Sequence, residues 1–227
     1  VFRAQLPADG YAVVMPILAT LLTHPKMVVH TYAATAIERL LTTREGVVAG
    51  GAAQGPLRFG APQLTPMLQG LLTGLFGALK LPGSSENAYV MRAILRVTSV
   101  AGEGMAPYAP TCIEELKGHL SRVCENPTNP SFNHYMFEAI AALVRSLCAT
   151  SPQAVDAFEQ MLFPPFQYVL QKDVSEFSPY VFQILAQLLE CRTSLSPAYA
   201  SLFAPILAPT MWERGANTPA LVRLLSA

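Results

Sequence analysis

The side chains that most often carry out chemistry in proteins are few in this 227-residue chain, and they are not grouped for it. The histidines stand far apart, and neither HExxH nor another local spacing of metal ligands occurs. No GxSxG turn, phosphate-binding P-loop or dinucleotide-binding glycine pattern is present in the sequence. The sequence therefore indicates no catalytic, cofactor-binding or metal-binding residues, and an enzyme would need a site assembled from distant residues. The histidines are His24, His30, His119 and His134.

The four cysteines indicate reduced thiols rather than a disulfide framework. Cys112, Cys124, Cys148 and Cys191 form no CxxC pair, and each stands in an apolar stretch suited to a helix. Buried reduced cysteines are usual in intracellular proteins. We predict that these thiols are free and mostly buried.

The composition is apolar and electrically balanced. Apolar residues make up 52% of the chain and charged ones 13%, and fifteen basic residues match fifteen acidic ones. Nucleic-acid binding depends on an excess of Lys and Arg, so we expect no nucleic-acid partner. The longest uncharged apolar stretch, residues 64–79, is shorter than the roughly 20 residues of a membrane span and contains glycines and threonines. A buried helix is favoured there over a membrane span, with close packing at Gly70 and Gly74.

Four tyrosines recur with similar neighbours behind them. Each is followed by aliphatic residues four, five and eight positions later, and the separations between the tyrosines are 57, 46 and 45 residues. Such offsets trace one stripe of an α-helix, and a helical unit at mid-forties spacing is typical of HEAT and armadillo proteins. We predict an all-α HEAT-repeat (ARM-like) α-solenoid of about four and a half helix pairs, with these tyrosines buried. They are Tyr32, Tyr89, Tyr135 and Tyr180.

In each pair we call the first helix outer and the second inner. The outer helices carry a proline, which bends a helix.

The glycine-rich segment 45–60 predicts a flexible loop, either a tolerated insertion or a loop that a partner regulates. Because both ends of the chain interrupt the pattern, we expect an internal segment of a longer array that aggregates or partly unfolds when excised. The predicted pairs are 8–43, 61–102, 106–149, 153–191 and a truncated 197–227.

A polar face is predicted on the inner helices. Eleven of the twelve residues three, seven and ten positions after the tyrosines are polar. Stacked inner helices would merge them into the concave wall with which solenoids bind proteins, although any solvated helix face has the same pattern. Arginines with few carboxylate neighbours suit an acidic partner surface. The candidate partner-binding residues are Arg92, Arg96, Glu138, Arg145, Gln183 and Gln187.

Several stretches resemble nuclear export receptors of the importin-β (karyopherin) superfamily, from about Leu21 to the end of the chain. The glycine-rich segment 45–60 departs from that resemblance, because a less glycine-rich link is expected there. The matching stretches are residues 30–41, 81–89, 126–127, 132–140, 180–183, 212–214 and 219–225.

The resemblance implies a receptor that binds importin-α together with GTP-bound Ran and shuttles between nucleus and cytoplasm. It implies no enzyme activity, no cofactor and no membrane partner, and it implies a receptor that is monomeric in its full-length form. No contact residue follows from the resemblance, since the matching stretches have the character of packing signatures. A general HEAT-repeat scaffold or adaptor without Ran dependence is the alternative.

Overall fold

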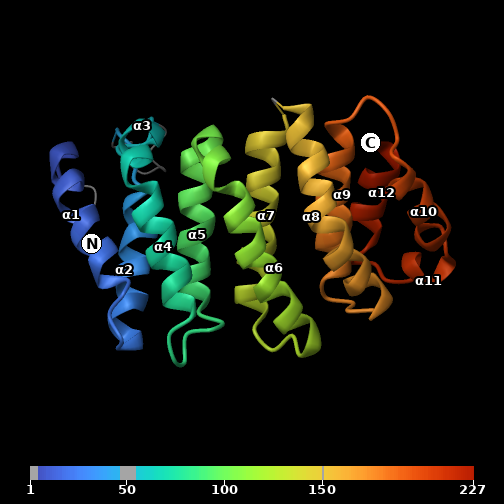
Figure 1. Ribbon diagram of the computed structural model, residues 1–227, viewed down its shortest axis with the longest axis horizontal. Coiled ribbons are helices and arrows are strands. Elements are labelled where there is room, and N and C mark those ends of the chain that lie inside the picture. Colours follow the sequence, from blue (N-terminus) through green and yellow to red (C-terminus); the bar gives the residue numbers. More distant parts are fainter. Residues whose placement is uncertain (1–4, 47–54, 150) are drawn as a thin grey trace. The chain divides into compact units, whose positions relative to one another are not determined.

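A computed structural model describes residues 5–46, 55–149 and 151–227, and its regular elements are helices (Figure 1). Within these ranges the only extended pairing is an isolated antiparallel bridge between Arg44 and Leu57. No helix in the same ranges is long and apolar enough to cross a bilayer. The α-helices are α1 (Ala8–Leu21), α2 (Met27–Leu40), α3 (Ala61–Leu64), α4 (Leu68–Leu79), α5 (Ala88–Ala101), α6 (Ala109–Glu125), α7 (Pro130–Cys148), α8 (Pro152–Gln171), α9 (Ser178–Glu190), α10 (Pro197–Ile206), α11 (Pro209–Trp212) and α12 (Thr218–Ser226), and the 3-10 helices are η2 (Thr65–Met67) and η3 (Gly102–Tyr108).

The chain divides into two compact units. Unit 1 comprises Val1–Thr111 and Pro127–Leu143, and in it α2 packs against both α1 and α5, while α4 packs against α5. Unit 2 comprises Cys112–Asn126 and Val144–Ala227, and in it α9 packs against α12 and α8. The arrangement of the whole chain as one array of the predicted pairs stays a prediction.

Proline and glycine shape the outer segments. The outer helix of the predicted pair 61–102 is interrupted, because Pro66 lies in η2 between α3 and α4. Pro107 likewise lies in η3 ahead of α6, whereas Pro16 and Pro164 are accommodated inside α1 and α8. Proline lacks the N–H that an α-helix needs, so a short 3-10 turn is a common local solution.

Close packing of α1 on α4 is confirmed at one of the two predicted glycines. A Cβ atom added to Gly74 would lie 3.1 Å from the Leu22 Cδ1 atom, tighter than ordinary van der Waals contact. The same atom added to Gly70 would meet nothing within 4 Å, so that glycine does not serve close packing.

The prediction of buried tyrosines is wrong. Tyr32 is 71% exposed and Tyr89 58% exposed, while Tyr135 and Tyr180 are half-buried. The buried stripe instead lies one, five and eight residues after each tyrosine. At about 100° per residue, those positions centre about 110° away from the tyrosine around the helix axis. The stripe comprises Ala33, Ile37 and Leu40 in α2, Val90, Ile94 and Val97 in α5, Met136, Ile140 and Leu143 in α7, and Val181, Leu185 and Leu188 in α9.

The predicted flexible segment 45–60 is ordered at its far end, and residues 47–54 lie outside the described residues. The backbone N–H of Arg58 donates to the carbonyl oxygen of Thr43, and the Arg58 guanidinium donates to the carbonyl oxygen of Leu6. Phe59 is buried and its ring stacks on that of Tyr11 at 5.8 Å between centroids. These contacts tie the end of the segment to the core of unit 1.

Asparagines at the starts of two inner helices in unit 1 each make two kinds of bond. The Asn87 carbonyl oxygen caps α5 by accepting from the backbone N–H groups of Tyr89 and Val90, while its amide donates to Thr31 Oγ1 at 2.7 Å. Asn129 repeats this device at the start of α7. Its oxygen accepts from the backbone N–H of Phe132, and its amide donates to the carbonyl oxygen of Glu86. One side chain thereby caps its own helix and ties it to the preceding repeat.

The Asn87 amide also leads into a buried chain of hydrogen bonds. It donates to Ser84 Oγ at 3.1 Å, and Ser84 Oγ lies 2.9 Å from Nε2 of the buried His30. His30 Nδ1 lies 2.9 Å from the carbonyl oxygen of His24, which can only accept, so Nδ1 carries the proton. Ser84 Oγ is thereby bonded to both the Asn87 amide and the His30 ring, and the chain of bonds reaches the turn before α2.

Ion pairs between helices take the corresponding place in unit 2. The Arg192 guanidinium meets Asp156 at 2.5 Å and Glu159 at 2.6 Å, Arg214 meets Asp173 at 2.5 Å, and Arg223 meets Glu190 at 2.8 Å. Each arginine comes from a later element of the sequence than its carboxylate. These pairs connect α8 to the segment after α9, and α9 to α12.

The four cysteines are free, as predicted, and three of them are buried. Burial raises the pKa of the Cys112 and Cys148 thiols to about 12 and that of the Cys124 thiol to about 11. The half-buried Cys191 has its pKa raised by the same cause. Since the thiolate is the reactive form, these groups are inert near neutral pH.

The two functions of Asn87 can be separated by substitution. Asn87→Asp keeps the capping oxygen and loses the amide donor, so it should lower the free energy of unfolding by about 1 kcal/mol. Asn87→Ala loses both and should cost about 2 kcal/mol. Urea unfolding followed by circular dichroism measures the difference. Ser151→Ala, which removes the cap from α8 and an exposed bond to Gln153 but no bond to another helix, is the control and should cost about 1 kcal/mol. An Asn87→Asp variant as stable as the parent protein would contradict the tie to α2, and equal losses for the two Asn87 variants would contradict the cap.

The pair between α9 and α12 should weaken in acid. Hydrogen bonds from Arg223 hold the pKa of Glu190 below its usual value of 4.5. A depressed carboxyl pKa contributes stability that is fully present above the unfolded pKa and is lost as the pH falls through the folded pKa. The stability lost in Arg223→Gln should therefore be constant above about pH 5.5 and shrink as the pH falls below 4.5. Urea unfolding across this range measures it, and Arg44→Gln, whose guanidinium donates to the carbonyl oxygen of Gly55, should show no such dependence.

Candidate partner-binding face

The candidate partner-binding surface lies on the inner helices of unit 1. It consists of the tyrosines and of the residues three and seven places after them. We call it the inner-helix face. Residues separated by three and seven positions lie on the same side of a helix, so the tyrosines share this side with the polar residues. The inner-helix face comprises Tyr32, Thr35 and Arg39 of α2, Tyr89, Arg92 and Arg96 of α5, and Tyr135 and Glu138 of α7.

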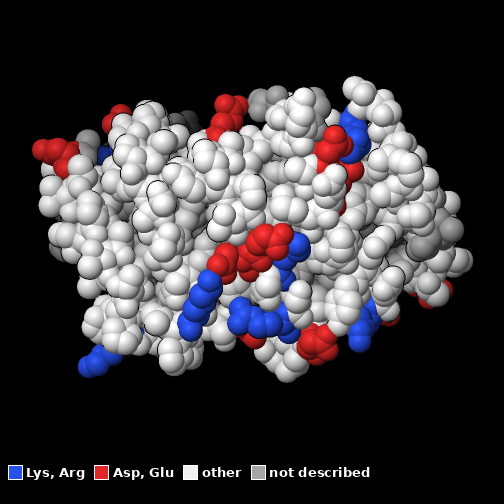
Figure 2. Space-filling view, in the orientation of Figure 1, with Lys and Arg blue, Asp and Glu red and all other residues white. Residues whose placement is uncertain are grey.

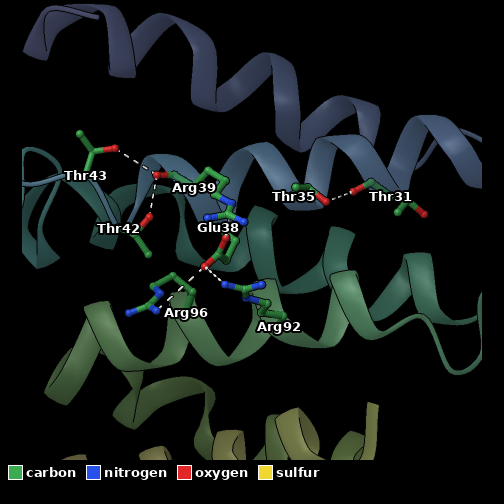
Figure 3. Close-up of polar contacts among 8 residues, drawn as sticks. All are labelled: Thr31, Thr35, Glu38, Arg39, Thr42, Thr43, Arg92 and Arg96. Carbon is green, nitrogen blue, oxygen red and sulfur yellow. Dashed lines mark hydrogen bonds and ion pairs between the residues drawn. The ribbon is translucent and has the colours of Figure 1, made fainter. Parts of the chain in front are cut away.

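A buried carboxylate lies beneath this face. The Glu38 side chain, only 3% exposed, reaches from α2 toward α5, where two arginines meet it (Figure 3). Its oxygens lie 3.3 Å from Arg92 Nη2, 4.0 Å from Arg96 Nη2 and 3.4 Å from Arg39 Nε. Removing a carboxylate from water is costly unless cations compensate it. The three guanidiniums supply that compensation and are held at the edge of the face.

Nearby threonines do not compete for the charged groups. The hydroxyl groups of Thr42 and Thr43 both donate to the carbonyl oxygen of Arg39, at 2.8 and 3.0 Å, and that of Thr35 donates to the carbonyl oxygen of Thr31 (Figure 3). Their donors are thus used by the backbone of their own helix. The arginines remain the principal donors toward solvent on this part of α2 and α5.

Arg92 also contacts the next inner helix. Its guanidinium carbon lies 5.7 Å from the centroid of the Tyr135 ring on α7. A cation above an aromatic face contributes about 0.5–1 kcal/mol at an exposed site. Arg92 therefore joins α2, α5 and α7 across the inner-helix face through one carboxylate and one ring.

Two expectations for the candidate residues are corrected. Arg92 and Arg96 are not isolated from carboxylates, because Glu38 of the preceding repeat lies between them. Gln187 is not on a solvent-facing surface: it is 8% exposed, and its buried side-chain oxygen has no hydrogen-bond partner. The reason is that α9 packs against α8 as well as α12, which buries more of its circumference than a single stripe.

The remaining candidates lie toward solvent in their own units. Glu138 is half-buried on α7 in unit 1, and Arg145 and Gln183 are exposed in unit 2. The structure brings Arg92 and Arg96 together at one carboxylate. Partner contact by any of these residues stays a prediction.

Sequence reasoning missed Glu38 and misplaced the tyrosines. For the tyrosines a signal was present, since the polar residues three and seven places after each of them share its side of the helix. Glu38 is less accessible to such reasoning, because it stands six places after Tyr32 and its partners come from another helix.

Outside the inner-helix face, we find no second candidate for a partner-binding surface among the described residues. Figure 2 shows charged side chains of both signs over α6 and large uncharged areas elsewhere on that face. Unit 2 contains an apolar cavity of about 380 Å³, lined among others by Leu170, Phe182, Leu202 and Met211. Among the residues the structure describes, no group of histidines, cysteines and carboxylates is placed to hold a metal ion.

Stacked helix pairs with a polar and aromatic inner face define a protein of the HEAT-repeat class. The family model described as the C-terminus of the CAS/CSE protein matches residues 38–227. The chain belongs to the CAS/CSE family, which confirms the predicted export-receptor resemblance at the level of the family.

Named relatives match over the entire chain. It is 46% identical to Exportin-2 of Mus musculus and 47% identical to Exportin-2 of Homo sapiens, in each case over 228 aligned residues. Each alignment includes 100% of this chain but 23% of the relative, so the chain spans about a quarter of the length of these proteins.

A solved structure confirms the predicted all-α HEAT-repeat fold class. The chain resembles "The exportin Cse1 in its cargo-free, cytoplasmic state" with a TM-score of 0.81 and 32% sequence identity. The likeness covers 99% of this chain and 22% of that one.

The coupling between α2 and α5 through the buried carboxylate can be measured by a double-mutant cycle. Arg92→Gln leaves Glu38 with two more distant partners and should lower the free energy of unfolding by about 1–3 kcal/mol. The loss in the double variant with Glu38→Gln should be smaller than the sum of the single losses by at least about 0.5 kcal/mol. Urea unfolding of the four proteins supplies the cycle, and strictly additive losses would show that the pair does not interact.

Proposed function

We propose that this chain is a segment of a nuclear export receptor that helps to bind importin-α together with GTP-bound Ran for return to the cytoplasm. The observation that carries the proposal is identity of 46–47% over the whole chain to proteins named Exportin-2. Likeness to the solved exportin Cse1 supports it further. The receptor shuttles between nucleus and cytoplasm, acts as a monomer and is not an enzyme.

The inner-helix face is the part of unit 1 best suited to this task. Solenoid proteins bind their partners along stacked helices, and aromatic and arginine residues are enriched where protein interfaces are strongest. This face presents Tyr32 and Tyr89 with large exposed fractions next to a row of arginines. Such a receptor binds its partners without chemical change. In this proposal, the GTP or GDP bound to Ran decides when importin-α is bound and when it is released.

The proposal predicts linked binding of the two partners. The complete protein in which this chain occurs should bind importin-α about 5–150-fold more tightly in the presence of GTP-bound Ran, which corresponds to a coupling of about 1–3 kcal/mol. By thermodynamic linkage, importin-α should strengthen the binding of Ran by the same factor. Surface-immobilised importin-α and a titration of the receptor, with Ran locked in its GTP form, measure both.

Ran loaded with GDP is the control and should produce no enhancement. Binding of importin-α that is indifferent to the nucleotide on Ran would contradict the proposal and favour a general HEAT-repeat scaffold.

A further inference from the structure

The inner-helix face has an aromatic edge. Tyr32 and Tyr89 are 71% and 58% exposed, and they occupy the same position in two adjacent inner helices. The hydrogen bond from the Asn87 amide to Thr31 Oγ1 joins the start of α5 to the second turn of α2, next to Tyr89 and Tyr32, so the two tyrosines lie at a similar level. Large exposed aromatic side chains in register on neighbouring helices are candidates for partner contact, because tyrosine is enriched among the residues that dominate interface energies.

A basic row lies behind that edge. The side chains of Arg39, Arg92 and Arg96 are 51%, 36% and 38% exposed, and they share the single buried carboxylate of Glu38. Glu38 Oε1 lies 3.3 Å from Arg92 Nη2 and 4.0 Å from Arg96 Nη2 and has no hydrogen-bond partner, so these two contacts are ion pairs and not hydrogen bonds. A guanidinium carries five N–H donors, and because Arg96 Nε is buried, the Nη groups of Arg96 are the donors left for an incoming acceptor. Glu138, half-buried on α7, is the other carboxylate of the face.

The spacing of the two rows selects the chemistry of the ligand. Seven residues separate Tyr32 from Arg39, which is about 10 Å along the helix axis. A bound segment would therefore place an apolar or aromatic side chain on the tyrosines and carboxylates on the arginines one to two turns further. Guanidinium and carboxylate match geometrically through paired N–H to oxygen bonds.

We propose that the inner-helix face of unit 1 binds an acidic protein segment that carries carboxylates for Arg39, Arg92 and Arg96 and apolar side chains for Tyr32 and Tyr89. This inference rests on the proposed function and names the chemistry of the partner surface that the segment would recognise. Glu38 is a positioning residue in it, because it holds Arg92 and Arg96 at the edge of the face without contacting the ligand. A nucleic acid is the less suitable ligand, since the chain has no excess of basic residues to neutralise phosphates.

The test uses the complete protein in which this chain occurs and a fluorescein-labelled peptide in which pairs of glutamate alternate with leucine. Fluorescence anisotropy at about 0.05 and 0.15 M salt should show binding that weakens as salt screens the charges. The same peptide with every glutamate replaced by glutamine should bind at least ~10-fold more weakly. Unlabelled heparin should compete less well than the acidic peptide does.

Variants of the face locate the binding. The double variant Tyr32→Ala/Tyr89→Ala changes two exposed side chains and should weaken peptide binding by at least ~10-fold. Arg96→Gln should weaken it and also reduce its salt dependence. Arg214→Gln removes an equally exposed arginine from unit 2 and should leave peptide affinity unchanged. Circular dichroism checks that each variant is folded.

The proposal is overturned if the glutamine peptide binds as well as the glutamate peptide, if heparin displaces the peptide as well as the peptide displaces itself, or if the tyrosine double variant and Arg96→Gln both bind like the parent protein. Failure of importin-α and Ran to bind cooperatively, with peptide binding intact and sensitive to these variants, would remove the proposed function and leave this surface standing. The reverse result would retain the export receptor and remove the surface.

Discussion

The packing of α2 against α5 is the interaction on which unit 1 depends. Ile37, Ile94 and Val97 are buried completely or nearly so, and burial of such a side chain contributes about 1.5–3 kcal/mol. Since α2 and α5 turn their buried stripes toward the helices packed against them, the side that carries the tyrosines is left for solvent. The exposed tyrosines and arginines are therefore a consequence of which residues form the buried stripe.

One carboxylate modifies this apolar contact. Glu38 is almost fully buried at the edge of the α2–α5 interface, where its charge requires cations nearby. The arginines that satisfy it come from both helices, and one of them continues to the Tyr135 ring on α7. A charge at this point fixes side chains that would otherwise sample many rotamers, and so gives three inner helices a defined polar surface.

Two polar devices connect the repeats, and unit 1 has both of them, since Arg92 of α5 also pairs with Glu38 of α2. In unit 1, Asn87 and Asn129 cap their own helices and donate to the preceding repeat. In unit 2, arginines such as Arg192 and Arg223 reach back to carboxylates 33–36 residues earlier. The asparagine bonds do not change with pH, whereas the carboxylate pairs depend on ionisation. Both devices add direction to apolar contacts, which by themselves do not specify register.

The sequence by itself determined the helical repeat, the free cysteines and the family, because these depend on local periodicity, on residue type and on long matching stretches. It also identified Arg92 and Arg96 as neighbours, since residues one turn apart meet on any helix. Only the tertiary structure decided that Tyr32 and Tyr89 face solvent, that Gln187 is buried and that Glu38 lies among three arginines. Those outcomes depend on how many sides of each helix are covered and on which residues of other helices lie opposite. Periodicity within one helix carries no information about either.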